Sequence, residues 1–498
     1  MNANFSVARN GLLTYSINNI YLHSSYNPIK EAERFVNSIE YNFIPEMIII
    51  TEPGISYCAD FFRQRFPNTQ LIAIRYSNDF IKFDSLFDYV IYNIEKLDSI
   101  INENNFSRIL FLSWKPSEKI FEKKHFETWN RIKKIVNFSR DILGTKNFFN
   151  QRWIKNIFIF CSSDLKTFSL NEIFKPIIII ASGPSLKNNL HNLNKYRENF
   201  FLIAVSSSVN TLIYHNIIPD LCISTDGGYW AKKHVQMIKN IPIAISAESA
   251  IPKKTLSNCS IVPLTYNDGI EYDILSRCNI NCLQTKRNGT VSGTAVELAL
   301  NLTKQNVGII GLDLTSSKSF QHTQPNELEK INSQSDYRIS NLPTRLINSE
   351  KNSGSLDIYA SWFKNQNKDF YKRFYRIIEN NISKIDLSPL RDIDFEQFLN
   401  INNSHKFNLN NENYFFKTSC LEKKQRCNIL LDYLSYAKNE IEKNNLLTES
   451  TYLLLEQIAT AEYVLYKKYN EKKYFENMKS KSIKFIEKLI FMVKQNAK

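Results

Sequence analysis

The feature that most constrains the fold is a series of short, continuous apolar runs separated by segments of about helix length. These runs occupy residues 157–160, 177–180, 201–205, 221–224, 241–247 and 307–310. Their β-branched residues follow one another without polar alternation, which is typical of strands that helices cover on both faces. Strands that alternate with helices in this way build a doubly wound, mainly parallel sheet. The sequence therefore predicts a Rossmann-like α/β domain in the middle of the chain.

The regions on either side of this pattern predict further domains, as expected for a chain of 498 residues. Before it, strand-like runs and a helix-like segment indicate a small α/β domain; they occupy residues 45–51, 71–74, 108–112 and 56–65. Beyond about Ser404 no strand is expected, and the apolar spacing of Leu430, Leu434 and Ala437 favours a helical bundle. The predicted domains are an N-terminal α/β domain (1–117), a helical connector (118–155), the central domain (156–403) and a C-terminal helical domain (404–498).

Charge, cysteine content and hydropathy exclude several classes of protein. The net charge of +14 is spread along the chain, and its densest clusters lie in helix-like sequence, so we expect solvated helix faces and no nucleic-acid partner. The eight cysteines include no Cys-x-x-Cys pair and predict reduced thiols rather than a zinc site. No apolar stretch is long enough for membrane insertion, and the first residues do not form a secretory signal. A cytoplasmic location is expected.

A turn of small residues follows the predicted strand at 177–180 and leads into a helix with an apolar face. This turn is Ala181-Ser182-Gly183-Pro184-Ser185-Leu186. Gly183 gives a ligand room to approach the backbone, Pro184 presets φ for the first helical turn, and the Ser185 hydroxyl can donate a hydrogen bond. Free amides at a helix N-terminus attract phosphate. The turn therefore predicts a nucleotide phosphate site, although an ordinary helix start would have the same sequence.

Polar residues follow other predicted strands at the same edge, where parallel sheets bind their ligands. They are Ser206, Asp226 with Gly227, and Asp313. A second helix start at 290–295 contains Ser292 and Gly293 and could supply another phosphate or base contact. Asp226 could bind sugar or ribose hydroxyls, or it could simply organise a turn.

Three other candidates have a structural and a functional interpretation. Glu52 ends a predicted strand, where it could contact a ligand or cap the following helix. Asp392-Ile393-Asp394 has the spacing of a metal-binding Asp-x-Asp motif, but acidic residues are also common at helix starts. His322 lies nearest the motif edge and could be a general base or an ordinary surface residue.

The order of these motifs resembles that of the Maf motility-associated flagellin glycosyltransferases. The resemblance covers most of residues 1–400 and rests on the segment 22–32 and on Gly183-Pro184-Ser185-Leu186, Ser206-Ser207-Ser208, Thr225-Asp226-Gly227, Ser292-Gly293-Thr294-Ala295, Gly311-Leu312-Asp313-Leu314 and His322. The central domain of that family is in turn similar to bacterial sialyltransferases that use CMP-activated sugars. What the resemblance implies is the transfer of a nonulosonic acid, such as a pseudaminic or legionaminic acid, from a CMP donor to Ser or Thr of flagellin.

The same resemblance implies roles for individual residues. Ser182 to Leu186, Ser206, Asp226, Gly227, Ser292 and Gly293 would hold the nucleotide and sugar, and Asp313 would shape the floor of the pocket. Ser388, in Asp386-Leu387-Ser388-Pro389-Leu390, resembles the last nucleotide contact of the sialyltransferases. CMP leaves as a single phosphate, so no cofactor is required, although a divalent cation could assist.

Two departures from the family pattern keep other functions open. Ala181 replaces a frequent glycine, and Thr315, Ser316 and Ser317 stand where the sialyltransferases have tyrosines. One alternative is an ATP-dependent enzyme similar to hydroxymethylpterin diphosphokinases, which would need Mg²⁺ and carboxylates near Asp226. Another is a non-catalytic flagellin-binding chaperone that retains a degenerate nucleotide fold.

Overall fold

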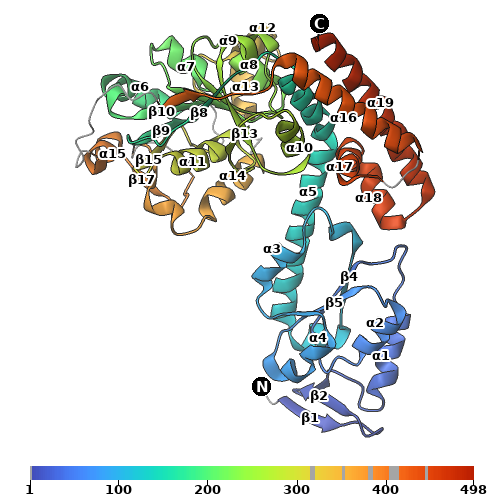
Figure 1. Ribbon diagram of the computed structural model, residues 1–498. Coiled ribbons are helices and arrows are strands. Elements are labelled where there is room, and N and C mark those ends of the chain that lie inside the picture. Colours follow the sequence, from blue (N-terminus) through green and yellow to red (C-terminus); the bar gives the residue numbers. More distant parts are fainter. Residues whose placement is uncertain are drawn as a thin grey trace. The chain divides into compact units, whose positions relative to one another are not determined.

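The computed structural model describes residues 3–314, 320–349, 354–379, 385–402, 414–443 and 447–497, which form two compact units (Figure 1). The N-terminal unit comprises Met1–Asn150 and Leu455–Ser482. The central unit comprises Gln151–Leu454 and Ile483–Lys498. The long helix α5 (Glu122–Cys161) contributes residues to both.

The N-terminal unit contains a parallel four-stranded sheet with the order β6-β5-β4-β7. Its strands are β4 (Met47–Thr51), β5 (Gln70–Ile74), β6 (Tyr89–Ile91) and β7 (Ile109–Ser113), and helices α1 (Pro28–Asn37) and α2 (Cys58–Arg65) belong to the same unit. A separate antiparallel sheet is formed by β1 (Ala3–Val7), β2 (Leu13–Ile17) and β3 (Ile20–Tyr21). The predicted strands at 45–51, 71–74 and 108–112 are therefore confirmed.

The central unit is built on an eleven-stranded sheet with the order β17-β16-β15-β9-β10-β11-β12-β13-β8-β18, in which β14 pairs with β13. All pairs are parallel except β18 with β8. Its strands are β8 (Lys166–Leu170), β9 (Ile177–Ile180), β10 (Phe201–Val205), β11 (Leu221–Ser224), β12 (Ile243–Ser246), β13 (Ser260–Thr265), β14 (Leu283–Gln284), β15 (Val307–Ile310), β16 (Phe374–Ile377), β17 (Arg391–Ile393) and β18 (Phe415–Lys417).

The strand order reverses direction beside β9. From β9 the chain adds β10 to β13 on one side, and it later places β15, β16 and β17 on the other. In open parallel sheets ligands bind at the carboxyl ends of the two strands that flank such a topological switch point, here β9 and β15. The predicted doubly wound α/β fold is confirmed.

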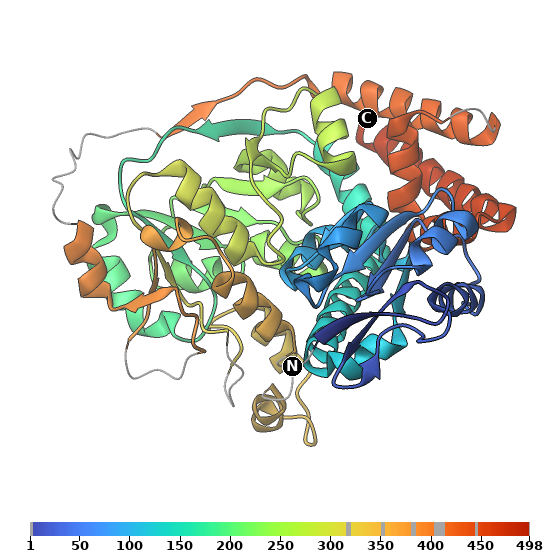
Figure 2. The same ribbon diagram turned by 90° about the horizontal axis from the view of Figure 1, so that it is seen from below.

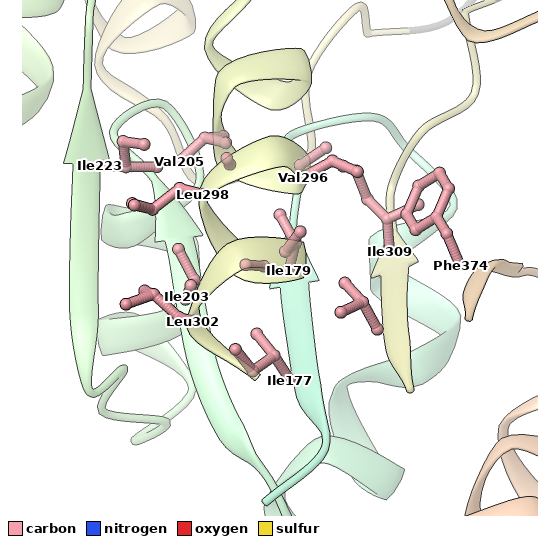
Figure 3. Packing of buried hydrophobic residues seen from close by; sticks show 14 of the residues in the cluster. Ile177, Ile179, Ile203, Val205, Ile223, Val296, Leu298, Leu302, Ile309 and Phe374 are labelled. Atoms are coloured by element: carbon pink, nitrogen blue, oxygen red, sulfur yellow. The ribbon is translucent and has the colours of Figure 1, made fainter. Parts of the chain in front are cut away.

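The core of the central unit lies between the sheet and helix α11 (Val291–Leu302), as Figure 3 shows. Val296, Leu298 and Leu302 of α11 pack against alternate residues of the strands, among them Ile179 and Ile203. Helices α6 (Leu186–Lys195) and α7 (Val209–Tyr214) lie on the opposite face (Figures 1 and 2). Because both faces are covered, the strands are apolar throughout, as their sequence predicts.

Two predictions about secondary structure are wrong. Residues 157–160 are not a strand but the last turns of α5. A short apolar run has the same composition in a buried helix and in a strand, so periodicity alone does not separate them. A strand also exists beyond Ser404, because β18 pairs with β8 through Phe415, Phe416 and Lys417. Its three residues are too few to show a pattern.

The predicted helical C-terminal region is confirmed in α16 (Lys423–Lys443), α17 (Glu449–Ile458), α18 (Thr460–Tyr469) and α19 (Lys472–Ala497). None of the helices that the structure describes is long and apolar enough to cross a membrane.

Candidate functional site

The turn between β9 and α6 packs directly against the loop after β15. Gly183 N donates to Gly311 O over 2.9 Å. A Cβ on Gly183 would lie 2.7 Å from Asp313 Oδ2, and one on Gly311, whose φ is +77°, would lie 2.5 Å from Ala181 O. Both glycines are therefore required for this close approach. Ala181, which stands where the family often has glycine, is buried beside the crossing point.

Asp313 fixes the first turn of α6 from beneath. Its carboxylate is buried and accepts the backbone amide of Ser185 over 2.8 Å at Oδ2, together with the Ser185 hydroxyl at Oδ1. Asp313 thus does what an N-cap side chain usually does, although it comes from the loop after β15. The amide and hydroxyl of Ser185, which the sequence offers to a phosphate, are both engaged with Asp313 here.

His322 is held against the same turn. Its Nδ1 lies 2.6 Å from Ser182 Oγ. The next residue, Thr323, donates its amide to Ser182 O over 2.8 Å and its hydroxyl to Gly183 O over 2.6 Å. Burial lowers the pKa of His322, while the backbone of Ser182 opposes that shift. The imidazole is therefore neutral near pH 7 and can accept a proton.

A second histidine, His234, belongs to this cluster and was missed in the sequence. It lies in α8 (Tyr229–Val235), which begins directly after the Asp226-Gly227-Gly228 turn. Burial and, to a smaller extent, the neighbouring His322 lower the pKa of His234 to about 4, while the charge of Asp226 opposes both. The three groups thus interact electrostatically. The available signal was its position on the first helix after the Asp-Gly-Gly turn, although its lysine neighbours are also typical of a solvated helix face.

Asp226 is exposed at the end of β11 and organises its own turn. Its Oδ1 accepts the Gly228 amide over 2.8 Å. Gly227 is buried, and a Cβ there would lie 2.6 Å from Trp153 Nε1. Asn156 Nδ2 donates to Glu248 O over 2.8 Å beside it. The turn-forming interpretation of Asp226 is therefore confirmed, and because the residue is exposed, the binding of sugar or ribose hydroxyls stays a prediction.

The other residues predicted to contact the nucleotide differ in their burial and in their hydrogen bonds to the rest of the protein. In α11 the Thr290 side chain caps the helix by accepting the Gly293 amide over 2.9 Å, and Ser292 is half-buried in the first turn. Ser206 is buried at the end of β10 and donates its amide to Ile223 O over 2.9 Å. Ser388 is exposed and donates its hydroxyl to Asp386 over 2.7 Å. Thr315, Ser316 and Ser317 lie outside the described residues.

The Asp-x-Asp sequence has a structural explanation. Asp392 lies in β17 and accepts two hydrogen bonds, of 2.7 and 2.8 Å, from the buried Arg376 guanidinium. Asp394 caps α15 (Phe395–Asn402) by accepting the Gln397 amide over 2.7 Å. Across the described ranges no group of three or more His, Cys, Asp or Glu side chains is arranged to hold a metal ion.

A polar network at the ends of β12 and β13 was also missed. Arg287 makes two hydrogen bonds to the buried carboxylate of Glu248, one of 2.7 Å from Nη2. Ser246 Oγ donates to Glu271 Oε1 over 2.5 Å, and burial together with the charge of Glu248 raises the pKa of Glu271 to about 7. Because 39 positions separate Arg287 from Glu248, no local pattern in the sequence reveals the pair.

Comparisons with known proteins agree with this architecture. Residues 151–319 match the family described as 6-hydroxymethylpterin diphosphokinase MptE-like. An uncharacterized protein of Treponema pallidum (strain Nichols) is 28% identical over 297 residues, which are 58% of this chain and 63% of that protein. A second uncharacterized protein of the same organism is 26% identical over 163 residues, covering 31% of this chain and 28% of the relative. The chain thus spans less than two thirds of the curated relatives it matches.

Among solved structures, that of the Maf glycosyltransferase from Magnetospirillum magneticum AMB-1 superimposes with a TM-score of 0.54 at 11% identity. The superposition covers 100% of this chain and 92% of that protein. The resemblance inferred from the motifs is confirmed at the level of the fold: the architecture is similar to that of a Maf glycosyltransferase, and residues 151–319 match the MptE-like family.

Proposed function

We propose that the chain is a glycosyltransferase that moves a nonulosonic acid of the pseudaminic or legionaminic type from a CMP-activated donor to Ser or Thr of flagellin. The observation that carries the proposal is the 2.6 Å contact between His322 Nδ1 and Ser182 Oγ at the switch point of the sheet. It joins a group that can take a proton to a turn that can hold a phosphate.

The hydrogen bond between these two side chains suits a transfer reaction in one orientation. If His322 Nδ1 carries the proton and donates it to Ser182 Oγ, then Nε2 is unprotonated and can act as the base. The Ser182 hydroxyl hydrogen is then free to bond a phosphate oxygen of the donor. His322 would thus act on the acceptor hydroxyl, and Ser182 would act on the phosphate of the donor.

The chemical step balances without a metal ion. The acceptor hydroxyl attacks the anomeric carbon of the sugar and gives its proton to His322 Nε2. The bond from that carbon to the phosphate oxygen breaks, and CMP leaves with the electron pair. Asp226 would bind sugar or ribose hydroxyls, and Ser206, Ser292, Gly293 and Ser388 would contact the nucleotide. His234 would stay neutral, so that no positive charge beside His322 would oppose its uptake of the proton.

A second function is favoured by the match of residues 151–319 to diphosphokinases. An ATP-dependent enzyme would need carboxylates that can hold Mg²⁺ at this edge. Asp226 is exposed there, but one of its oxygens accepts the Gly228 amide, and Asp313 is engaged with Ser185. Because both carboxylates already accept hydrogen bonds from the protein, this edge favours a donor with a single phosphate over ATP with Mg²⁺. A chaperone without catalysis remains a third alternative.

The test is to incubate the purified protein with a CMP-nonulosonate and unmodified flagellin and to measure the intact mass of flagellin. The proposal expects an increment of one or more sugar residues, and no increment with either pseudaminic or legionaminic donors would contradict it. Thermal shift separates the alternatives. If the chain is a transferase, CMP should raise its thermal unfolding midpoint, and if it is a diphosphokinase, ATP with Mg²⁺ should do so. If it is a chaperone, neither nucleotide should change the midpoint.

A further inference from the structure

The histidine at the switch point lies in a loop, so its position depends on what holds that loop. His322 belongs to no helix or strand and is half-buried. Its Nδ1 lies 2.6 Å from Ser182 Oγ, but a single hydrogen bond between two side chains does not determine the path of a backbone. The next residue, Thr323, is 5% exposed and makes backbone contacts that do so.

The amide, the hydroxyl and the carbonyl of Thr323 are all hydrogen-bonded. The amide donates to Ser182 O over 2.8 Å, and the hydroxyl donates to Gly183 O over 2.6 Å. The carbonyl accepts the side-chain amide of Asn326 over 3.1 Å. Thr323 thus attaches the loop of His322 to two successive carbonyls of the turn beside which this histidine lies.

A second threonine holds the loop from α7. Thr211 is fully buried, and its hydroxyl lies 3.0 Å from Pro325 O and 3.2 Å from Thr323 O, which can both accept it. The side chain of Asn326 caps the start of α12 (Glu327–Gln334). The loop is therefore fixed between the β9–α6 turn, α7 and α12, and none of these contacts uses the imidazole.

The turn itself has contacts that do not depend on Thr323. Gly183 N donates to Gly311 O over 2.9 Å, and Gly183 O also accepts the Leu186 amide over 3.1 Å. Gly183 O therefore keeps a donor when the Thr323 hydroxyl is removed. A methyl group in place of that hydroxyl cannot approach a carbonyl oxygen as closely as 2.6 Å. The substitution should thus displace the loop of His322 and leave the turn in place.

We infer that Thr323, supported by Thr211, is a positioning residue that holds the His322 imidazole against Ser182 and thereby sets which ring nitrogen carries the proton. The inference rests on the proposed function, in which His322 is the general base. While Nδ1 stays within hydrogen-bond distance of Ser182 Oγ it can keep its proton and donate it there, which leaves Nε2 as the base. A displacement of about 1 Å at a reacting group can lower a rate about 10²-fold.

A buried threonine elsewhere in the central unit provides a matched control. Thr303, which follows α11, is 3% exposed, and its hydroxyl donates to Lys175 O over 3.1 Å near the start of β9. Thr303→Val and Thr323→Val each remove a buried hydroxyl that donates to a backbone carbonyl. The Thr303 hydroxyl lies at the amino end of the sheet, and the Thr323 hydroxyl lies beside His322.

The experiment determines the tautomer of His322 by nitrogen NMR of labelled histidine in the full-length protein at neutral pH, with His322→Ala to assign its signals. In the wild type and in Thr303→Val we expect one tautomer, with the proton on Nδ1. Thr323→Val should give a mixture that includes the Nε2-protonated form, and Thr323→Ser, which keeps the hydroxyl, should restore the single tautomer. A proton on Nε2 in the wild type, or an unchanged tautomer in Thr323→Val, would overturn the inference.

This measurement needs neither a sugar donor nor flagellin, so it is independent of whether the protein transfers sugar. Absence of transfer by the wild type contradicts the proposed function, whereas the tautomers test the role of Thr323. With an active wild type, Thr323→Val should lower kcat about 10- to 100-fold at unchanged KM for the donor. A raised KM at unchanged kcat would assign Thr323 to donor binding and overturn its role in positioning.

Thr211→Val keeps the inference open to refutation if Thr323→Val does not fold. It removes the support of the loop from α7 and leaves both bonds from Thr323 to the turn intact. We expect the same admixture of the Nε2-protonated form of His322 and the same direction of change in kcat, both smaller than in Thr323→Val. A single Nδ1-protonated tautomer together with an unchanged kcat would contradict the support assigned to Thr211.

Discussion

The two parallel sheets of this chain end differently at their carboxyl edges. In the N-terminal unit Glu52 ends β4 with its side chain fully buried. It accepts the amides of Gly54, Tyr76 and Ser77 and pairs with the buried Arg75 over 3.2 Å. In the central unit Asp226 ends β11 in an exposed position, with one oxygen given to a single amide.

This difference separates an edge that is closed by its own side chains from one that is open to a ligand. Glu52 has a φ of +37°, and the strain of that conformation is balanced by hydrogen bonds that leave no carboxylate oxygen for a ligand. Glu52 therefore neither offers an oxygen to a ligand nor caps the following helix, since α2 has no side-chain cap. Both roles expected from the sequence are wrong. A carboxylate at a strand end is therefore a candidate ligand contact only where the neighbouring loops leave it unsaturated.

The largest expected effect concerns the open edge. His322→Ala should lower the rate of sugar transfer about 10²- to 10⁴-fold, because it removes a general base, while the CMP-induced thermal shift is retained. His191→Ala is the control, since His191 lies exposed on α6. Turnover is measured by intact flagellin mass over time. Near-normal transfer by His322→Ala would remove this histidine from the mechanism.

A substitution at the closed edge should lower the free energy of unfolding of the N-terminal unit. Arg75→Ala leaves Glu52 buried without its ion-pair partner and should lower the free energy of unfolding of the N-terminal unit by about 3–5 kcal/mol. Urea denaturation followed by fluorescence measures it. Arg63→Ala breaks an ion pair with Asp88 that is about 38% exposed and should cost no more than about 1 kcal/mol. Equal losses in the two variants would contradict the comparison.

Asp226→Asn tests the exposed carboxylate itself. The amide oxygen can still accept from Gly228, so the free energy of unfolding should change by less than about 0.5 kcal/mol. Loss of a charged hydrogen bond to a hydroxyl should raise the KM for the donor about tenfold. A destabilised variant with unchanged KM would show that Asp226 serves only the turn.

The smallest expected effect is on the pH profile. The base must be neutral, so kcat/KM should be lost as the pH falls through the pKa of His322, which burial places below the ordinary value of about 6.5. Activity should therefore be on its plateau at pH 7. An acidic limb centred above pH 6.5, or the same limb in the residual activity of His322→Ala, would assign it to another group.

The sequence predicts much of the fold because its signals are local. β-Branched runs identify β4, β9, β10, β11 and β15, and these strands carry most of the predicted site. The run at 157–160 fails because a buried helix end and a strand have the same composition, and β18 is too short to show any period.

The site is predicted less completely because its contacts join distant parts of the chain. Asp313 was expected beneath the pocket, but the sequence does not reveal that it takes up both Ser185 groups. His234 lies among residues that suggest a solvated helix face.

The most direct test of the difference between the edges is amide hydrogen exchange with and without CMP. The account predicts slower exchange in residues 181–187 and 225–229 when CMP is present and no change in residues 52–57. Slower exchange at 52–57, or none at 181–187, would contradict the assignment of the donor to the open edge of the central sheet.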